Sequence, residues 1–231
     1  IAISRSGASD LHRHFGVPEE RIGVVYGGVT PEELDGTPDP EALAALRARF
    51  GITRDYFIHL GTLEPRKNIP RLLRAYAGLR ARRKDSPQLV LAGKAGWMFD
   101  EIFALIAERK LEGDVVHTGY LERTEAVQLL QGAYACVYPS LYEGFGLPAL
   151  EAMAAGTPVL TSNVSSLPEV VGDTGLLVDP ESEDSIEAGL LELIDDPDAA
   201  KRRAEAARDR ARTFTWDRSA ETLAGIYRAL S

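Results

Sequence analysis

Two glutamates, Glu143 and Glu151, lie on either side of a glycine-rich turn in the stretch YPSLYEGFGLPALEAMAAGTPVLTS, residues 138–162. Pro148 suits the first position of a helix that would run to Ala155 and end at Gly156. The residues before or at the start of this helix have amides placed where unpaired N–H groups and the helix dipole favour an anion. They are Gly144, Phe145, Gly146 and Leu147. We therefore predict a backbone cradle for a diphosphate.

The two carboxylates do not suit phosphate binding themselves. Two unit charges about 4 Å apart repel by roughly 1 kcal/mol in water, and several-fold more in a partly dry cleft. Glu143 and Glu151 would instead accept hydrogen bonds from hydroxyl groups on the two sides of the diphosphate. A diphosphate with a hydroxylated ring at each end is a nucleotide sugar. Taken singly, Glu143 also fits a surface loop, and Glu151 also fits a residue that complements a helix N-terminus.

A bound diphosphate also needs positive charge, which the stretch LGTLEPRKN (residues 60–68) supplies as Arg66 and Lys67. Lysine provides a point charge and arginine a two-pronged donor. Both suit a leaving diphosphate whose negative charge grows as a glycosidic bond breaks. Without the cradle, a solvated turn would be the better interpretation of this pair.

Short β-rich runs alternate with amphipathic stretches over most of the chain. The runs cover residues 21–28, 55–61, 87–93, 114–119, 133–140, 157–162 and 174–180. Helices are expected over residues 39–50, 69–84, 99–110, 183–195, 198–212 and 216–230. Apolar strands separated by helices indicate a parallel sheet covered on both faces. We predict one doubly wound, Rossmann-like α/β domain over residues 1–231.

Glycines close three successive strands at their carboxyl ends: Gly61, Gly93 and Gly119. Ligands bind at this edge of open parallel sheets, and glycine lets a ligand approach the backbone closely. Neither G-x-G-x-x-G nor G-x-x-x-x-G-K-[ST] occurs, which disfavours the usual dinucleotide site and a P-loop.

Composition restricts the classes of ligand. The net charge of −9 argues against nucleic acid or an anionic membrane as a partner, and favours a small phosphorylated ligand bound by a local cluster. The single cysteine, Cys136, lies in an apolar run and is expected to be a buried strand residue, which fits a reducing, cytoplasmic location. No apolar run approaches the ~18 residues of a membrane span, and the first residues do not read as a leader. Peripheral membrane attachment stays open.

We expect neither a metal ion nor a cofactor. The histidines show no metal or triad spacing, and they fit surface or strand packing. Asp196-Pro197-Asp198 matches a metal-carrying D-x-D, but it separates two predicted helices. Asp196 therefore fits a helix cap, with Pro197 in the first helical position.

Together these motifs resemble the donor site of family-4 (group 1) retaining glycosyltransferases. The resemblance rests on EGFGLPALEAMAAGTPV (residues 143–159), with its glutamates at the family's spacing, and on LGTLEPRKN and SSLPEVVGDTGLLVDP (residues 165–180). It runs from about Ser4 to the end of the chain. It implies the GT-B fold, in which two Rossmann-like domains face each other and the C-terminal one holds the sugar nucleotide.

The resemblance also implies residue roles. Glu143 would contact the donor sugar, Glu151 the ribose hydroxyls, and the amides of residues 144–147 the donor phosphates and sugar. Lys67 matches the family's phosphate-binding lysine. The nucleobase would lie near Gly93 and the segment made of Gly119, Tyr120 and Leu121. Many members carry an arginine where this chain has Thr62, so Arg66 must substitute or the site has one cation fewer.

A second departure from the family is length, because the acceptor-binding N-terminal domain is absent. The first residues resemble the junction at which the C-terminal domain begins, with Gly27 where asparagine is common. Residues 214–231, which include Trp216, resemble the helix that crosses back to the missing domain, so its apolar residues are expected to be partly uncovered. The acceptor, a saccharide or a lipid-linked molecule, would bind through that missing domain.

The leading hypothesis is therefore the donor half of a retaining hexosyltransferase in which Lys67, Arg66 and Glu143 serve catalysis. GTLEPRKN and SNVSSLPEV (residues 162–170) are most similar to mannosyltransferase-type members, so GDP-mannose leads and UDP-glucose follows. One alternative is a sugar-nucleotide 2-epimerase of related fold, which needs an acid and a base near the hexose. Another is a non-catalytic nucleotide-sugar-binding module.

Overall fold

The centre of the molecule is a six-stranded sheet in which all neighbouring strands are parallel, in the order β3-β2-β1-β4-β5-β6. The computed structural model describes residues 1–30, 34, 36–96 and 100–230. The strands are β1 (Tyr56–Leu60), β2 (Gln88–Ala92), β3 (Val115–Gly119), β4 (Ala135–Tyr138), β5 (Val159–Ser162) and β6 (Leu176–Val178). The predicted doubly wound, Rossmann-like α/β fold is confirmed.

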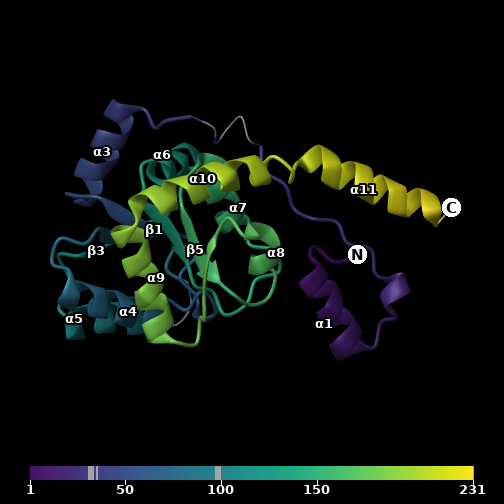
Figure 1. Cartoon of the computed structure of the whole chain (residues 1–231), viewed down its shortest axis with the longest axis horizontal. Helices are drawn as coiled ribbons and strands as arrows, with labels where there is room; N and C mark the ends of the chain where they lie inside the picture. The colour runs from purple at the N-terminus through teal and green to yellow at the C-terminus, as the bar shows by residue number, and fades with distance from the viewer. Residues whose placement is uncertain (31–33, 35, 97–99, 231) are drawn as a thin grey trace.

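Helices cover both faces of the sheet (Figure 1). One face carries α3 (Pro40–Phe50), α6 (Arg123–Gln131), α7 (Leu147–Ala155), α8 (Leu167–Val171) and α10 (Pro197–Ala211). The other carries α4 (Ile69–Arg82), α5 (Asp100–Glu108) and α9 (Glu183–Asp195). The helices that the sequence predicted have bounds within two residues of the predicted ones, and position 99 lies outside the described residues. Helices α6 and α8 were not predicted. Every described helix is too short or too polar to span a bilayer.

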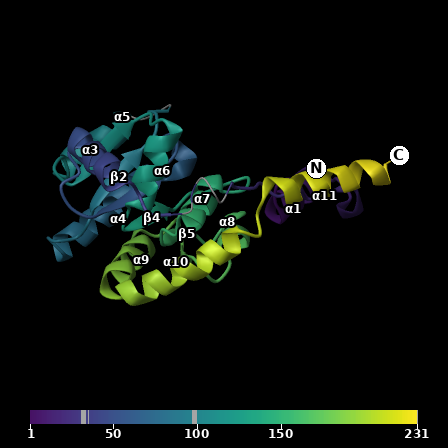
Figure 2. The same ribbon diagram turned by 90° about the horizontal axis from the view of Figure 1, so that it is seen from above.

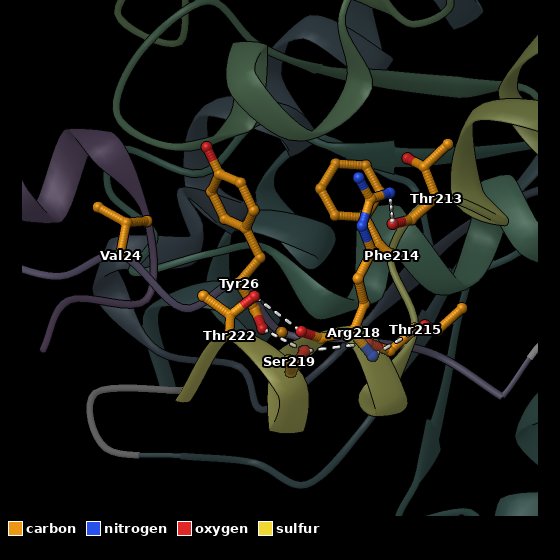
Figure 3. Close-up of a pocket in the computed structure, with 9 residues that line it drawn as sticks. Val24, Tyr26, Thr213, Phe214, Thr215, Arg218, Ser219 and Thr222 are labelled. Carbon is orange, nitrogen blue, oxygen red and sulfur yellow. Dashed lines mark hydrogen bonds between the residues drawn. The ribbon is translucent and has the colours of Figure 1, made fainter. Parts of the chain in front are cut away.

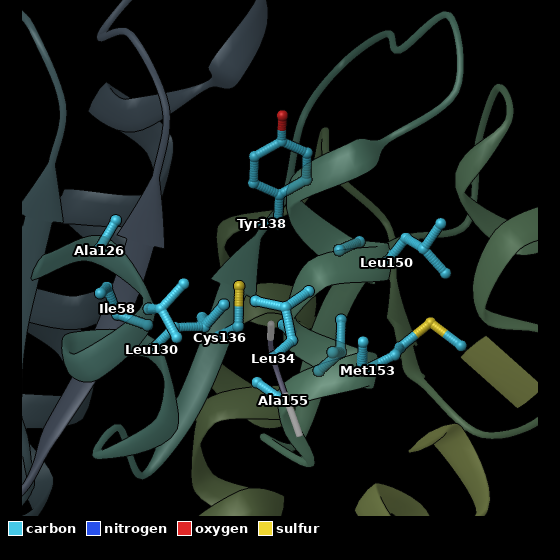
Figure 4. Packing of buried hydrophobic residues seen from close by; sticks show 14 of the residues in the cluster. Leu34, Ile58, Ala126, Leu130, Cys136, Tyr138, Leu150, Met153 and Ala155 are labelled. Carbon is cyan, nitrogen blue, oxygen red and sulfur yellow. The ribbon is translucent and has the colours of Figure 1, made fainter. Parts of the chain in front are cut away.

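Two apolar cores form because strand residues alternate between the faces. On β1, Ile58 belongs to the first core and Phe57 to the second, and on β4 the same holds for Cys136 and Val137. Figure 4 shows Ile58 and Cys136 packed within the first core. Cys136 is fully buried, as predicted, and burial raises the pKa of its thiol to about 12.

Two helix starts were predicted from proline and capping residues. Asp196 caps α10 as expected, because its carboxylate accepts a hydrogen bond from the Ala199 amide at 2.8 Å. The start of α7 is off by one residue. Leu147, rather than Pro148, is its first residue, and Gly146 precedes it in the left-handed region with φ 101°. Glycine at this position lets the chain turn sharply into the helix.

A small layer lies apart from the sheet, formed by α1 (Arg5–Phe15), the 3-10 turn η1 (Glu19–Arg21) and α11 (Trp216–Ala229). Both Figure 1 and Figure 2 show α1 and α11 on the same side of the molecule, away from the strands. Neither helix contains a buried residue. The apolar residues of the last helix are partly uncovered, as expected, and Trp216 and Tyr227 are 52% and 59% exposed.

The predicted strand over residues 21–28 is wrong. This segment leads from the outlying layer to the sheet, and it forms one bridge, between Val24 and Ala2, outside the sheet. Its apolar side chains are only half-buried. This segment therefore has the composition of a strand, but it serves as a connection between the two layers.

The two chain crossings between the layers run side by side. The Val29 amide donates to the carbonyl of Phe214 at 2.9 Å, and the Ser219 hydroxyl donates to the carbonyl of Tyr26 at 2.6 Å. The Tyr26 ring lies 5.8 Å from the ring of Phe145, measured between centroids. The crossings are thus joined to each other and to the loop that precedes α7.

Candidate functional site

The predicted binding edge is built where β1 and β2 end. The Gly61 amide donates to the carbonyl of Ala92 at 2.9 Å, and the Leu63 amide donates to that of Lys94 at 2.9 Å. Gly93 has φ +154°, and a Cβ there would lie 2.0 Å from the Gly61 carbonyl oxygen. The two loops therefore pack so closely that Gly93 has no room for a side chain.

Lys67, Arg66 and Glu143 meet at this edge. Lys67 ends the 3-10 turn η2 (Pro65–Lys67), and Glu143 lies on the loop after β4. The Lys67 ammonium is 2.7 Å from one Glu143 carboxylate oxygen, and the Arg66 guanidinium is 2.6 Å from the other. Lys67 and Glu143 are 5% and 6% exposed. The three residues proposed for catalysis therefore form one cluster with Glu143 at its centre.

The charges in this cluster perturb one another. Burial by itself would raise the pKa of Glu143, but hydrogen bonds and charge from Lys67, Tyr138 and Arg66 hold it below its usual value. Burial lowers the pKa of Lys67, and the Glu143 carboxylate opposes this effect. Glu143 is therefore ionised at neutral pH, and it is the counter-ion of a buried ammonium group.

The loop that carries Glu143 is held by two serines that precede α8. The Ser165 hydroxyl accepts from the Glu143 amide at 2.9 Å. The Ser166 hydroxyl lies 2.9 Å from the carbonyls of both Glu143 and Phe145. From the other side, the Asn68 amide group donates to the carbonyl of Pro139 at 3.0 Å. Hydrogen bonds from two sides therefore anchor the loop that carries Glu143.

The predicted cradle lies directly after Glu143. Within the part of the chain that the structure describes, four successive amides donate no hydrogen bond: those of Gly144, Phe145, Gly146 and Leu147. They stand at the N-terminus of α7, where the helix dipole favours an anion. The four free amide donors and the N-terminus of α7 thus directly follow Glu143, which belongs to the Lys67 cluster.

Glu151 is separate from this cluster. It is the fifth residue of α7, and its carboxylate lies 2.6 Å from the guanidinium of Arg123 on α6. Nothing in the sequence pattern indicated Arg123 as its partner.

A pocket of about 360 Å³ lies at the same edge. It is lined by Leu60, Gly61, Thr62, Ala92, Gly93, Lys94, Tyr120, Leu121, Ala126 and Pro148. Four predicted donor-binding residues are among them: Gly61, Gly93, Tyr120 and Leu121. Gly119 immediately precedes Tyr120 at the end of β3. The Lys94 ammonium lies 4.7 Å from the Tyr120 ring centroid, a cation–π contact that the sequence did not indicate.

Another pocket, of about 340 Å³, lies at the chain crossings and contains no predicted site residue. Figure 3 shows Tyr26, Phe214 and Ser219 around it. Among the described residues, no group of three or more His, Cys, Asp or Glu side chains could hold a metal ion.

The family described as "Glycosyl transferases group 1" matches residues 45–210. O-antigen chain mannosyltransferase B of Escherichia coli is 35% identical over 230 residues, which cover 100% of this chain and 60% of that protein. MMP alpha-(1->4)-mannosyltransferase of Mycolicibacterium hassiacum is 35% identical over 233 residues, which cover 98% of this chain and 53% of that protein.

A solved glycosyltransferase from Rickettsia africae has the same fold, with a TM-score of 0.90 and 20% identity. The match covers 99% of this chain and 62% of that one. The chain thus spans little more than half the length of the curated relatives it matches.

Proposed function

The chain belongs to the group 1 glycosyl transferases, and from this membership we propose that it is the donor-binding half of a retaining hexosyltransferase. A hexosyl group would pass from a nucleoside-diphosphate sugar to an acceptor hydroxyl. The observation that carries the proposal is the buried Lys67–Glu143 pair beside four unpartnered amides at a helix N-terminus. Cationic and neutral hydrogen-bond donors lie close together along the chain and at this edge of the sheet, and both kinds of donor would bind a diphosphate.

The diphosphate would lie between the amides of residues 144–147 and the cations Lys67 and Arg66. An ammonium group has three protons, and a phosphate oxygen would accept one that Glu143 leaves unused. Negative charge accumulates on the diphosphate as the glycosidic bond breaks, so both cations bind the transition state more tightly than the substrate. No metal ion or bound cofactor enters this proposal.

The two glutamates would bind hydroxyl groups of the sugar and the ribose. Each Glu143 oxygen contacts a cation and keeps a further lone pair that a sugar hydroxyl can use. Glu151 would bind the ribose while Arg123 holds one of its oxygens. The nucleobase would enter the pocket lined by Gly93, Tyr120 and Leu121.

The relatives support a choice of donor and a location for the acceptor site. Two relatives at 35% identity are named mannosyltransferases, which supports a mannosyl group. We favour GDP-mannose, with UDP-glucose second. Because the chain spans little more than half of these relatives, we assign acceptor binding to a further Rossmann-like domain of a GT-B enzyme. The exposed apolar side of α11 would contact that domain, and the whole enzyme would act in the reducing cytoplasm.

A thermal-shift panel tests the donor site. GDP, UDP, ADP and their sugars are each added to the 231-residue chain. A ligand at about 100 times its dissociation constant adds about 2.7 kcal/mol to the free energy of unfolding. For a domain of this size we expect the melting temperature to rise by roughly 5–10 °C. We expect binding without sugar transfer.

Lys67→Ala should reduce this shift strongly, because it removes the buried ammonium. Lys84→Ala is the matched control, since Lys84 is exposed beyond the far end of α4. The proposal fails if no nucleotide shifts the melting temperature, or if the two variants respond alike. Chelators should leave binding unchanged, and a loss of binding on chelation would contradict the metal-free site.

A further inference from the structure

A buried aromatic pair lies beneath the Lys67 cluster and has no part in the roles given above. Tyr138 is the last residue of β4, and His59 lies on the neighbouring strand β1. Their rings stack with centroids 5.2 Å apart and an interplanar angle of 17°. Both side chains are fully buried. The pair therefore connects the apolar core to the charged edge of the sheet.

The Tyr138 hydroxyl reaches that charged edge. Figure 4 shows it directed away from the apolar residues around Cys136. It accepts a hydrogen bond from the Lys67 ammonium, whose nitrogen lies 4.6 Å from the Tyr138 ring centroid. Burial raises the pKa of the Tyr138 phenol, and the nearby Glu143 carboxylate raises it further, so the hydroxyl stays protonated.

These contacts orient the ammonium group. Glu143 and Tyr138 accept two of the three Lys67 protons, and together they determine where the third one points. An ideal Cβ built on Gly61 would lie 3.9 Å from the ammonium nitrogen, so the ammonium group lies against the strand end that carries the binding edge. A phenylalanine at position 138 would fill the core equally well. Packing alone therefore does not require the Tyr138 hydroxyl.

His59 supports Tyr138 as a neutral ring. Its Nδ1 lies 3.1 Å from the Val137 carbonyl oxygen, and because a carbonyl only accepts, Nδ1 carries the proton. Its buried Nε2 has no hydrogen-bond partner among the described residues. Burial, aided by Lys67, lowers the pKa of His59 to about 4. At neutral pH the ring therefore stacks on Tyr138 without placing a second positive charge near Lys67.

We infer that Tyr138 is a positioning residue: its hydroxyl, supported from below by His59, aims the Lys67 ammonium at the diphosphate. This inference rests on the proposed function, because it assigns to Lys67 a phosphate to meet. It adds a residue that the glycine-rich turn, the two glutamates and the cation pair do not include.

A double-mutant cycle between Tyr138 and Lys67 tests the inference, with GDP, UDP and inorganic pyrophosphate as probes in calorimetric titrations. Tyr138→Phe keeps the ring and removes the hydroxyl. We expect its affinity for the diphosphate that the wild type binds best to fall about tenfold. In a Lys67→Met background the same change should have no further effect. Tyr134→Phe is the matched control, because its hydroxyl donates to the Leu193 carbonyl at 3.1 Å and contacts no site residue.

The pH at which Lys67 titrates, followed by NMR of its ε-methylene group, gives a readout that loss of packing does not mimic. We expect it to fall in Tyr138→Phe, since the charged ammonium loses an acceptor, and to stay unchanged in Tyr134→Phe. Undiminished binding by Tyr138→Phe, alongside a large loss in Lys67→Met, would overturn the inference and leave the proposed function standing. An equal loss from Tyr138→Phe in both backgrounds would also overturn it. Unchanged binding in Lys67→Met would overturn the proposed function itself.

Discussion

The buried His59 predicts how the stability of this protein depends on pH. Its pKa is about 4 in the folded protein and 6.5 in its ordinary state. Between these values the unfolded chain binds a proton that the folded protein does not bind. The free energy of unfolding therefore decreases as the pH falls from about 6.5 towards 4.

The magnitude follows from the size of the shift. One pKa unit corresponds to about 1.36 kcal/mol, so a shift of about 2.5 units is worth about 3.4 kcal/mol when fully expressed. At pH 5, where titration is incomplete, the loss relative to pH 8 is about 2 kcal/mol. Glu143, one of the nearest charged groups, keeps its charge between these two pH values, because its pKa lies below its usual value of 4.5.

Urea denaturation followed by circular dichroism at pH 8 and pH 5 measures the effect. His59→Phe keeps a stacked ring that cannot take up a proton. The other histidines are common to both proteins, so the difference between the two isolates His59. We expect the stability advantage of the wild type to shrink by about 2 kcal/mol from pH 8 to pH 5. His14→Gln serves as a control for removing an exposed imidazole. A wild-type advantage that stays constant to within about 0.5 kcal/mol would refute a buried, neutral His59.

Two further substitutions test the frame that holds the site. Gly93→Ala should cost about 3 kcal/mol or more in chemical denaturation, because a Cβ would lie 2.0 Å from the Gly61 carbonyl oxygen. Gly113→Ala, whose Cβ would meet nothing within 4 Å, should cost far less, and equal losses would contradict the close packing of the two loops. Asp196→Ala removes the cap on the Ala199 amide and should lower stability by about 1 kcal/mol. An unchanged melting temperature would show that this cap contributes nothing.

The sheet could be predicted from the sequence because each strand is a short apolar run bounded by turn residues. Residues 21–28 have the same composition, and they form no strand of the sheet. Composition indicates that a segment can be extended and partly buried. Strand pairing also needs a second extended segment, which the fold must bring alongside. Residues 21–28 cross between layers, and their pairing among the described residues is limited to one bridge with Ala2, outside the sheet.

The site was predictable only in parts. Lys67 and Glu143 could each be proposed from local motifs, but their contact joins residues 76 positions apart and depends on the turn that buries the lysine. Tyr138 reads as an ordinary core residue of a strand. Only its place as the last residue of β4 puts the hydroxyl among charges. Arg123 carries no local signal as the partner of Glu151, because it stands in a different motif.

The paired crossings between the sheet and the outlying layer have a mechanical consequence. Two connections that are hydrogen-bonded to each other, as at Val29 and Phe214, restrict the rotation of the outlying layer relative to the sheet more than a single connection would. The Glu169 carboxylate on α8 accepts a hydrogen bond from the Arg5 amide, at the start of α1, at 2.9 Å. Ser166, one residue before α8, donates a hydrogen bond from its hydroxyl to the Glu143 carbonyl. A tilt of α1 would thus displace α8 through Glu169, and α8 would displace Glu143, the counter-ion of Lys67, through Ser166.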